Sequence, residues 1–184
     1  YFPDRVVPML PESLSADMCS LKQGQDRAAL ACHLRIDGKG KLSGFRFSRA
    51  VIRVAANLSY EEAQGAIDRG GHPLLEPALK PLWACWSLLA KARAQREPLE
   101  LDLPERRVQL DSEGRISAIS VRERLDAHRL IEDFMIMANV AAAKALEAKK
   151  APVMYRVHEP PAREKLVALK EYLETFDLSF ALGQ

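Results

Sequence analysis

The chain has 184 residues, of which 48% are hydrophobic and 28% are charged, and these values are typical of a globular domain with a real core. Its 27 basic and 25 acidic residues give a net charge of +2, which neither demands nor excludes a nucleic-acid partner. The 3 cysteines form no CxxC pair, which argues against a zinc ribbon or a disulfide framework and favours a reducing compartment. No apolar run approaches the ~20 residues of a membrane span, so we expect a cytoplasmic protein with no membrane partner.

The first strands are predicted at residues 27–36 and 41–55. Residues 1–14 precede them and contain three prolines, which lack the amide hydrogen of a helix, so we expect an extended loop or edge strand there. Apolar and polar residues alternate along residues 27–36, and a glycine-containing turn at residues 37–40 leads into the second strand, which predicts a hairpin. Its second strand carries three basic residues that form either a solvated face or a track for a phosphate backbone: Arg46, Arg49 and Arg53.

A helix is predicted to begin directly after this hairpin. Ser59 followed by Glu62 three residues later is a capping box, and Gly70 with Gly71 ends the helix. A second, longer helix is predicted over residues 73–96, with two prolines that kink or delay its opening turns.

Several shorter elements follow. Residues 99–101, 107–110 and 116–121 are strand candidates, and the last two form a second hairpin around an Asp-Ser-Glu-Gly turn. Beyond the next helix, residues 153–157 are predicted as a short strand and residues 161–176 as an amphipathic helix. Two small sheets and about four helices in mixed order predict an α+β domain.

The longest predicted helix covers residues 124–146, RLDAHRLIEDFMIMANVAAAKAL, which contain no glycine or proline. From Leu130 onward its apolar residues cover nearly the whole circumference, which is typical of a helix buried on most sides. We therefore expect small antiparallel sheets packed around a long buried central helix. Asp133 lies four residues from Arg129, close enough for an ion pair, so Glu132 is left without an obvious partner.

Three residues are candidates for ligand binding, and each has a structural alternative. Tyr1 and Tyr60 are either ordinary core or surface aromatic residues, or flat faces on which a base stacks. Glu132 either pairs with Arg124, Arg129 or the basic hairpin, or is held in a buried site to accept hydrogen bonds from hydroxyl groups. Spacing alone does not decide between these alternatives. None of the 4 histidines has HExxH or HxH metal-site spacing, and no P-loop, GxSxG or GxGxxG motif occurs.

Four motifs occur in a characteristic order along the chain. They are YFPDRVVPMLPESLSADMCSL at the start, ANLSYEEA after the first hairpin, RLDAHRLIEDFMIMANVAAAKAL, and MYRVHEPPAREKL. Together they resemble the catalytic domain of the ribonuclease II/ribonuclease R superfamily, with the ribonuclease R type the more similar. The resemblance covers essentially the whole chain.

The resemblance implies a processive hydrolase that degrades single-stranded RNA from the 3′ end and releases nucleoside 5′-monophosphates, with Mg²⁺ held by a carboxylate cluster. By motif, Tyr1 matches an aromatic residue that contacts the RNA, and Tyr60 matches the tyrosine that shapes the cavity around the 3′ nucleotide. Glu132 matches the glutamate associated with recognition of the terminal ribose. A carboxylate can accept a hydrogen bond from a ribose 2′-OH, which DNA lacks.

The chain departs from the family pattern in two respects. Leu101 lies where the family often has an aromatic residue. The aspartate cluster would precede Tyr1 and the arginine-rich segment would follow Gln184, so residues 1–184 are interpreted as a middle part of the catalytic domain. We expect no catalytic residue or metal ligand in this part, no cleavage by it alone, and cold-shock and S1-type domains beside it in the parent protein. The alternatives are a non-catalytic RNA-binding module of the same fold, or a purely structural scaffold.

Overall fold

The computed structural model describes residues 2–96, 103–121 and 123–182. Tyr1, Leu101 and the strand predicted at residues 99–101 lie outside these ranges. The chain forms two compact units, Tyr1–Ala145 and Leu146–Gln184.

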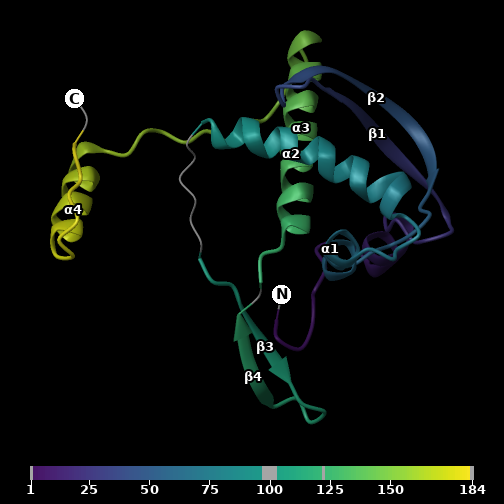
Figure 1. Ribbon diagram of the computed structural model, residues 1–184, viewed down its shortest axis with the longest axis horizontal. Coiled ribbons are helices and arrows are strands. Elements are labelled where there is room, and N and C mark those ends of the chain that lie inside the picture. The colour runs from purple at the N-terminus through teal and green to yellow at the C-terminus, as the bar shows by residue number, and fades with distance from the viewer. Residues whose placement is uncertain (1, 97–102, 122, 183–184) are drawn as a thin grey trace. The chain divides into compact units, whose positions relative to one another are not determined.

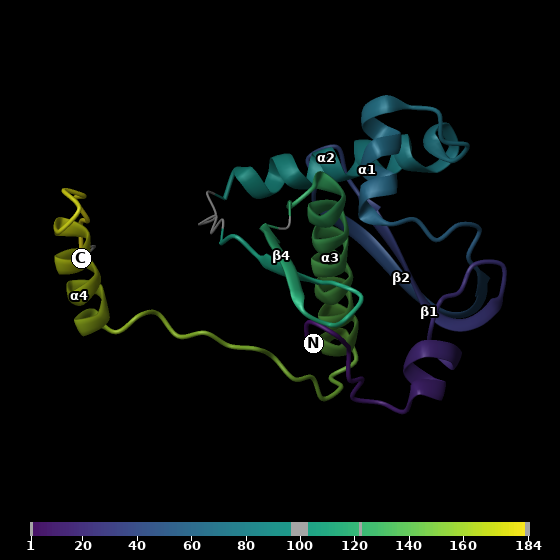
Figure 2. The ribbon, with the colours of Figure 1, turned by 90° about the horizontal axis from the view of Figure 1, so that it is seen from below.

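A long antiparallel hairpin lies in the first unit, as predicted (Figures 1 and 2). Strand β1 (Asp26–Ile36) pairs with strand β2 (Leu42–Arg53). In the connecting turn, the Asp37 carboxylate accepts hydrogen bonds from the backbone amides of Lys41 and Lys39, both at 2.9 Å. These bonds stabilise the charged form and hold the pKa of Asp37 below its usual value, with the bond from Lys41 the larger cause.

Helix α1 (Tyr60–Arg69) begins at the predicted capping box. The Ser59 hydroxyl accepts from the Glu62 amide at 3.1 Å, and the Glu62 carboxylate accepts from the Ser59 amide at 2.7 Å. The helix ends at Gly70, whose φ of 76° favours glycine. The start and the end of α1 are therefore both fixed by local sequence.

Replacing Ser59 with alanine is expected to lower the free energy of unfolding by about 1 kcal/mol, because the cap of α1 loses its hydroxyl acceptor. Backbone and side-chain hydrogen bonds from Ser59 lower the pKa of Glu62. The stability that the Glu62 carboxylate contributes is therefore fully present above the pKa of Glu62 in the unfolded chain. It is lost as the pH falls through the lower pKa of Glu62 in the folded state. Urea unfolding from pH 7 to pH 3 measures both effects. Ser112→Ala, at an exposed turn, is the control, and equal losses in the two variants would contradict the capping role.

The helix predicted over residues 73–96 is delayed by its prolines, as expected. A short π-helical turn, η2 (Leu75–Leu79), leads into α2 (Lys80–Ala94), and Pro81 lies in the first turn of α2. Proline is tolerated there because the amide that it lacks has no intrahelical partner. An earlier π-helical turn, η1 (Ser13–Met18), precedes β1.

The long helix α3 (Asp126–Ala148) is present as predicted, but its burial is one-sided. Its buried residues are Ala127, Leu130, Asp133 and Ala141. Apolar side chains on its other faces are exposed, with Met135 at 61%. The α+β class is confirmed, whereas burial of α3 on most sides is not confirmed, because apolar side chains on its other faces are exposed. Figures 1 and 2 both show α2 passing across α3.

The remaining elements are small. Strands β3 (Arg106–Leu110) and β4 (Ile116–Val121) form the predicted second hairpin. The second unit contains α4 (Arg163–Glu174), but the strand predicted at residues 153–157 is absent, since these described residues pair with no other strand. Among the described residues, no helix is both long and apolar enough to span a membrane.

Candidate functional site

Tyr60 lies at the first position of α1, and its ring stacks on the imidazole of His128 in α3. The ring centroids are 4.1 Å apart and the planes are inclined by 21°. A second link lies beside the stack, because the Gln64 side-chain oxygen accepts from the Ala127 amide at 3.1 Å. Tyr60 as a residue is still 37% exposed. The start of α3 is thereby fastened to α1, and one aromatic face is held at the surface between them.

Glu132 lies one helical turn beyond His128, so the two side chains share a face of α3. Its carboxylate pairs with the Arg124 guanidinium at 2.6 Å, and the side chain is 48% exposed. Of the two alternatives for Glu132, the ion pair with Arg124 is therefore present in the structure, whereas the buried site is not, because the side chain is half exposed. A carboxylate has about four acceptor positions, so an exposed Glu132 can still accept from a second donor.

The buried carboxylate of α3 is its neighbour Asp133, which is 6% exposed. It accepts hydrogen bonds from the indole nitrogen of Trp86 and from a guanidinium nitrogen of Arg93, both at 2.9 Å. The predicted pair between Asp133 and Arg129 is wrong, because Arg129 pairs with Asp126 at 3.2 Å. Asp133 joins α3 to α2 and is therefore assigned to packing.

The structure thus brings Tyr60 and the Glu132 face of α3 together, with His128 between them. Tyr1, the third predicted residue, and Leu101 lie outside the described residues. Sequence reasoning assigned no role to His128. The signal was available, since His128 precedes Glu132 by four residues on one helix.

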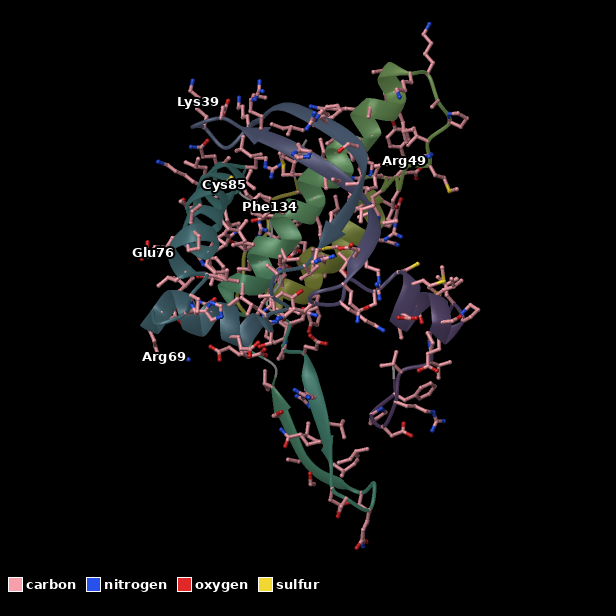
Figure 3. The ribbon with its side chains drawn as sticks, turned by 90° about the vertical axis from the view of Figure 1, so that its right-hand side faces the viewer. Lys39, Arg49, Arg69, Glu76, Cys85 and Phe134 are labelled. Carbon is pink, nitrogen blue, oxygen red and sulfur yellow. The ribbon has the colours of Figure 1, made fainter. Side chains whose placement is uncertain are left out.

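The three arginines of the basic hairpin differ in their partners. Arg53 forms a two-pronged pair with Asp26 of the neighbouring strand, at 2.6 Å and 2.9 Å, which raises the pKa of Arg53. Arg46 and Arg49 are exposed and have no ion pair within the described residues. In Figure 3, Lys39 lies at the tip of the hairpin and Arg49 lies farther along β2. Both alternatives for Arg46 and Arg49, solvated face and phosphate track, stay open.

A hollow of about 910 Å³ lies between the hairpin turn, the end of α2 and α3, away from the Tyr60 stack. Its apolar lining residues include Leu89 and Met137. Its basic lining residues are Lys39, Lys41, Lys91, Arg93, Arg96 and Lys144. Neither Tyr60 nor Glu132 lines it. Across residues 2–96, 103–121 and 123–182, no three His, Cys, Asp or Glu side chains gather closely enough to hold a metal ion.

Residues 1–182 match the family model described as the RNB domain. The chain belongs to the RNB domain family. The similar proteins include ribonuclease R of Aquifex aeolicus, 41% identical over 95% of this chain, and ribonuclease R of Vibrio cholerae, 36% identical over the whole chain. The chain spans about a quarter of these two relatives, 25% and 23% of their lengths.

Solved structures agree with this assignment. Ribonuclease R of Mycoplasma genitalium in complex with ribose-methylated single-stranded RNA matches 98% of the chain with a TM-score of 0.89 at 26% identity. The match covers 29% of that protein. The Dss1 exoribonuclease from Candida glabrata at 17% identity has a TM-score of 0.68, which shows the fold alone. The resemblance to the ribonuclease R type is confirmed.

Proposed function

We propose that this RNB domain is part of a processive, hydrolytic 3′-to-5′ exoribonuclease that acts on single-stranded RNA and releases nucleoside 5′-monophosphates. The observation that carries the proposal is the Tyr60–His128 stack, one helical turn from Glu132, on the fold of ribonuclease R. An exposed aromatic face holds a base without reading its sequence, and a nearby carboxylate accepts from a ribose hydroxyl. One of the ribonuclease R structures that match this chain is a complex with ribose-methylated single-stranded RNA.

In this proposal the chain contributes part of the RNA channel and of the 3′-end pocket. Tyr60 stacks on the terminal nucleotide, Glu132 accepts from its 2′-OH, and Tyr1 adds a second aromatic contact. In this proposal no residue of this chain binds the metal. The proposed Mg²⁺ ligands, and the cold-shock and S1-type domains, belong to the rest of the parent protein, which we place in the cytoplasm.

Replacing Glu132 with glutamine in the full-length protein is expected to lower the ratio of kcat/KM for RNA over DNA about tenfold to a hundredfold. A hydrogen bond to a charged acceptor contributes about 1.5–3 kcal/mol, and the DNA substrate offers no 2′-OH to form it. The pair with Arg124 is exposed on both sides, so its loss has little effect on stability. The measurement uses RNA and DNA oligonucleotides of one sequence.

The control for this experiment is Glu171→Gln on α4, which removes an exposed carboxylate elsewhere. Discrimination unchanged in the Glu132 variant would show that Glu132 does not recognise the ribose. A full-length protein that binds RNA but releases no monophosphate would instead favour the non-catalytic RNA-binding module.

A further inference from the structure

The orientation of the Tyr60 ring depends on His128. The backbone of Tyr60 is fixed by the Ser59 cap, but a backbone anchor leaves the side-chain torsions free. Among the described residues, no hydrogen bond holds the Tyr60 hydroxyl, and the only ring stacked on Tyr60 is the imidazole of His128. The plane of the phenol ring is therefore set by the plane of the imidazole.

The imidazole is itself fixed by a backbone hydrogen bond. Nδ1 of His128 accepts from the Leu125 amide at 3.2 Å, just before α3 begins. In the same way, the Glu62 carboxylate accepts from the Ser59 amide three residues earlier, at the start of α1. An accepting Nδ1 carries no hydrogen, so the neutral ring carries its hydrogen on Nε2. The tautomer and the orientation of the ring are both determined by this bond.

Nε2 of His128 is buried and has no hydrogen-bond partner among the described residues. A buried donor without a partner destabilises the folded state, so capping alone does not account for a histidine here. An aspartate or glutamate would cap the Leu125 amide and leave no such donor. The property that imidazole adds is the flat face against Tyr60, and polar groups that cost stability are found preferentially at functional sites.

We propose that His128 is a positioning residue of the exoribonuclease, which holds the Tyr60 ring in the plane that stacks on the 3′-terminal nucleotide. The inference rests on the proposed function, because Tyr60 must contact RNA for its orientation to matter. His128 does not touch the reacting atoms in this scheme. It acts through Tyr60, and its place one turn before Glu132 keeps the aromatic face and the carboxylate on one side of α3.

Two variants of the full-length protein separate the roles of the imidazole. His128→Asn keeps a side-chain oxygen that can accept from the Leu125 amide but removes the ring, whereas His128→Phe keeps a ring for the stack but removes the acceptor. His72→Asn is the matched control, because Nδ1 of His72 accepts from the Leu74 amide at 3.1 Å and His72 has no aromatic stack among the described residues.

The expected result is that His128→Asn raises KM for single-stranded RNA about tenfold, with kcat within about twofold, since base stacking contributes about 1–3 kcal/mol per base. It should also change the length of the smallest end product in the same direction as Tyr60→Ala. His128→Phe should restore KM and the wild-type product despite its lower thermal stability, and the His72 control should resemble the wild type.

The outcomes distinguish this inference from the function on which it rests. If Tyr60→Ala changes the product but His128→Asn does not, the positioning role is wrong and the proposed function stands. A phenylalanine variant as impaired as the asparagine variant would also overturn the positioning role, because the ring would not suffice. If the wild-type protein degrades no RNA, or Tyr60→Ala behaves as wild type, both proposals are overturned.

Discussion

Replacing Asp133 with alanine is expected to lower the free energy of unfolding by about 3 kcal/mol. The carboxylate is 6% exposed and accepts from Trp86 and Arg93 of α2, and removing it leaves the indole donor and the guanidinium without this partner. Breaking a buried charge pair from one side costs about 3–5 kcal/mol. The lower end applies because the Arg93 side chain is 24% exposed and is partly solvated after the change.

The matched control is Asp126→Ala, which removes a carboxylate from the same helix. Asp126 pairs with Arg129 at 3.2 Å, and both side chains are exposed by more than two-fifths. Exposed pairs contribute about 0–1 kcal/mol, so this variant should unfold near the wild-type midpoint. Urea titration followed by tryptophan fluorescence compares the two variants, since Trp86 itself reports on the contact. Equal midpoints for the two variants would show that Asp133 does not join α2 to α3.

Asp133 also marks where prediction from sequence stops. The spacing of four residues predicted a pair between Asp133 and Arg129, because spacing indicates only contacts within one helix. The observed partners lie 47 and 40 positions earlier in the chain. Long-range hydrogen bonds depend on how helices cross, and no periodicity encodes that. For this reason the sequence did not show that Asp133 is the buried carboxylate and that Glu132 is exposed.

The parts that were predicted are those determined by neighbouring residues. The β1–β2 hairpin follows from alternation and a turn, and the capping box at Ser59 follows from a three-residue spacing. The extent of α3 was predicted because its residues are strong helix formers. Its burial was not, because burial depends on what packs against each face. The short strand predicted at residues 153–157 failed for a related reason, since a strand needs a partner that its own sequence does not provide.

The candidate site also combines residues that the sequence predicted with contacts that it did not. The motifs selected Tyr60 and Glu132 by resemblance, but neither motif contains the reason that they lie near each other. The link is His128, whose ring stacks across two helices. The functional roles of Tyr60 and Glu132 stay predictions until the variants described above are measured.

Gly40 is the position where a single added methyl group should have a comparable effect on stability. Its φ is +72°, and a Cβ placed there would lie 2.2 Å from the backbone oxygen of Leu88 and 2.8 Å from the Cβ of Ala92, both in α2. A non-glycine residue in the left-handed region costs about 1–2 kcal/mol, and overpacking costs about 1–3 kcal/mol. We therefore expect Gly40→Ala to lower the free energy of unfolding by about 2–5 kcal/mol, the sum of the two costs.

Variants of two other glycines separate the backbone cost from the overpacking cost. Gly38 lies in the same turn with no positive φ and no atom within 4 Å of an added Cβ, so Gly38→Ala should be neutral or slightly stabilising. Gly114 has a φ of +78° and open space around it, so Gly114→Ala measures the backbone cost alone. Urea unfolding measures the loss in free energy of unfolding for each of the three variants. The loss of Gly40→Ala in excess of that of Gly114→Ala is the steric cost of the contact with α2. If Gly40→Ala loses no more free energy of unfolding than Gly114→Ala, the turn is not packed tightly against α2. The hollow beside the turn would then owe its shape to something other than this contact.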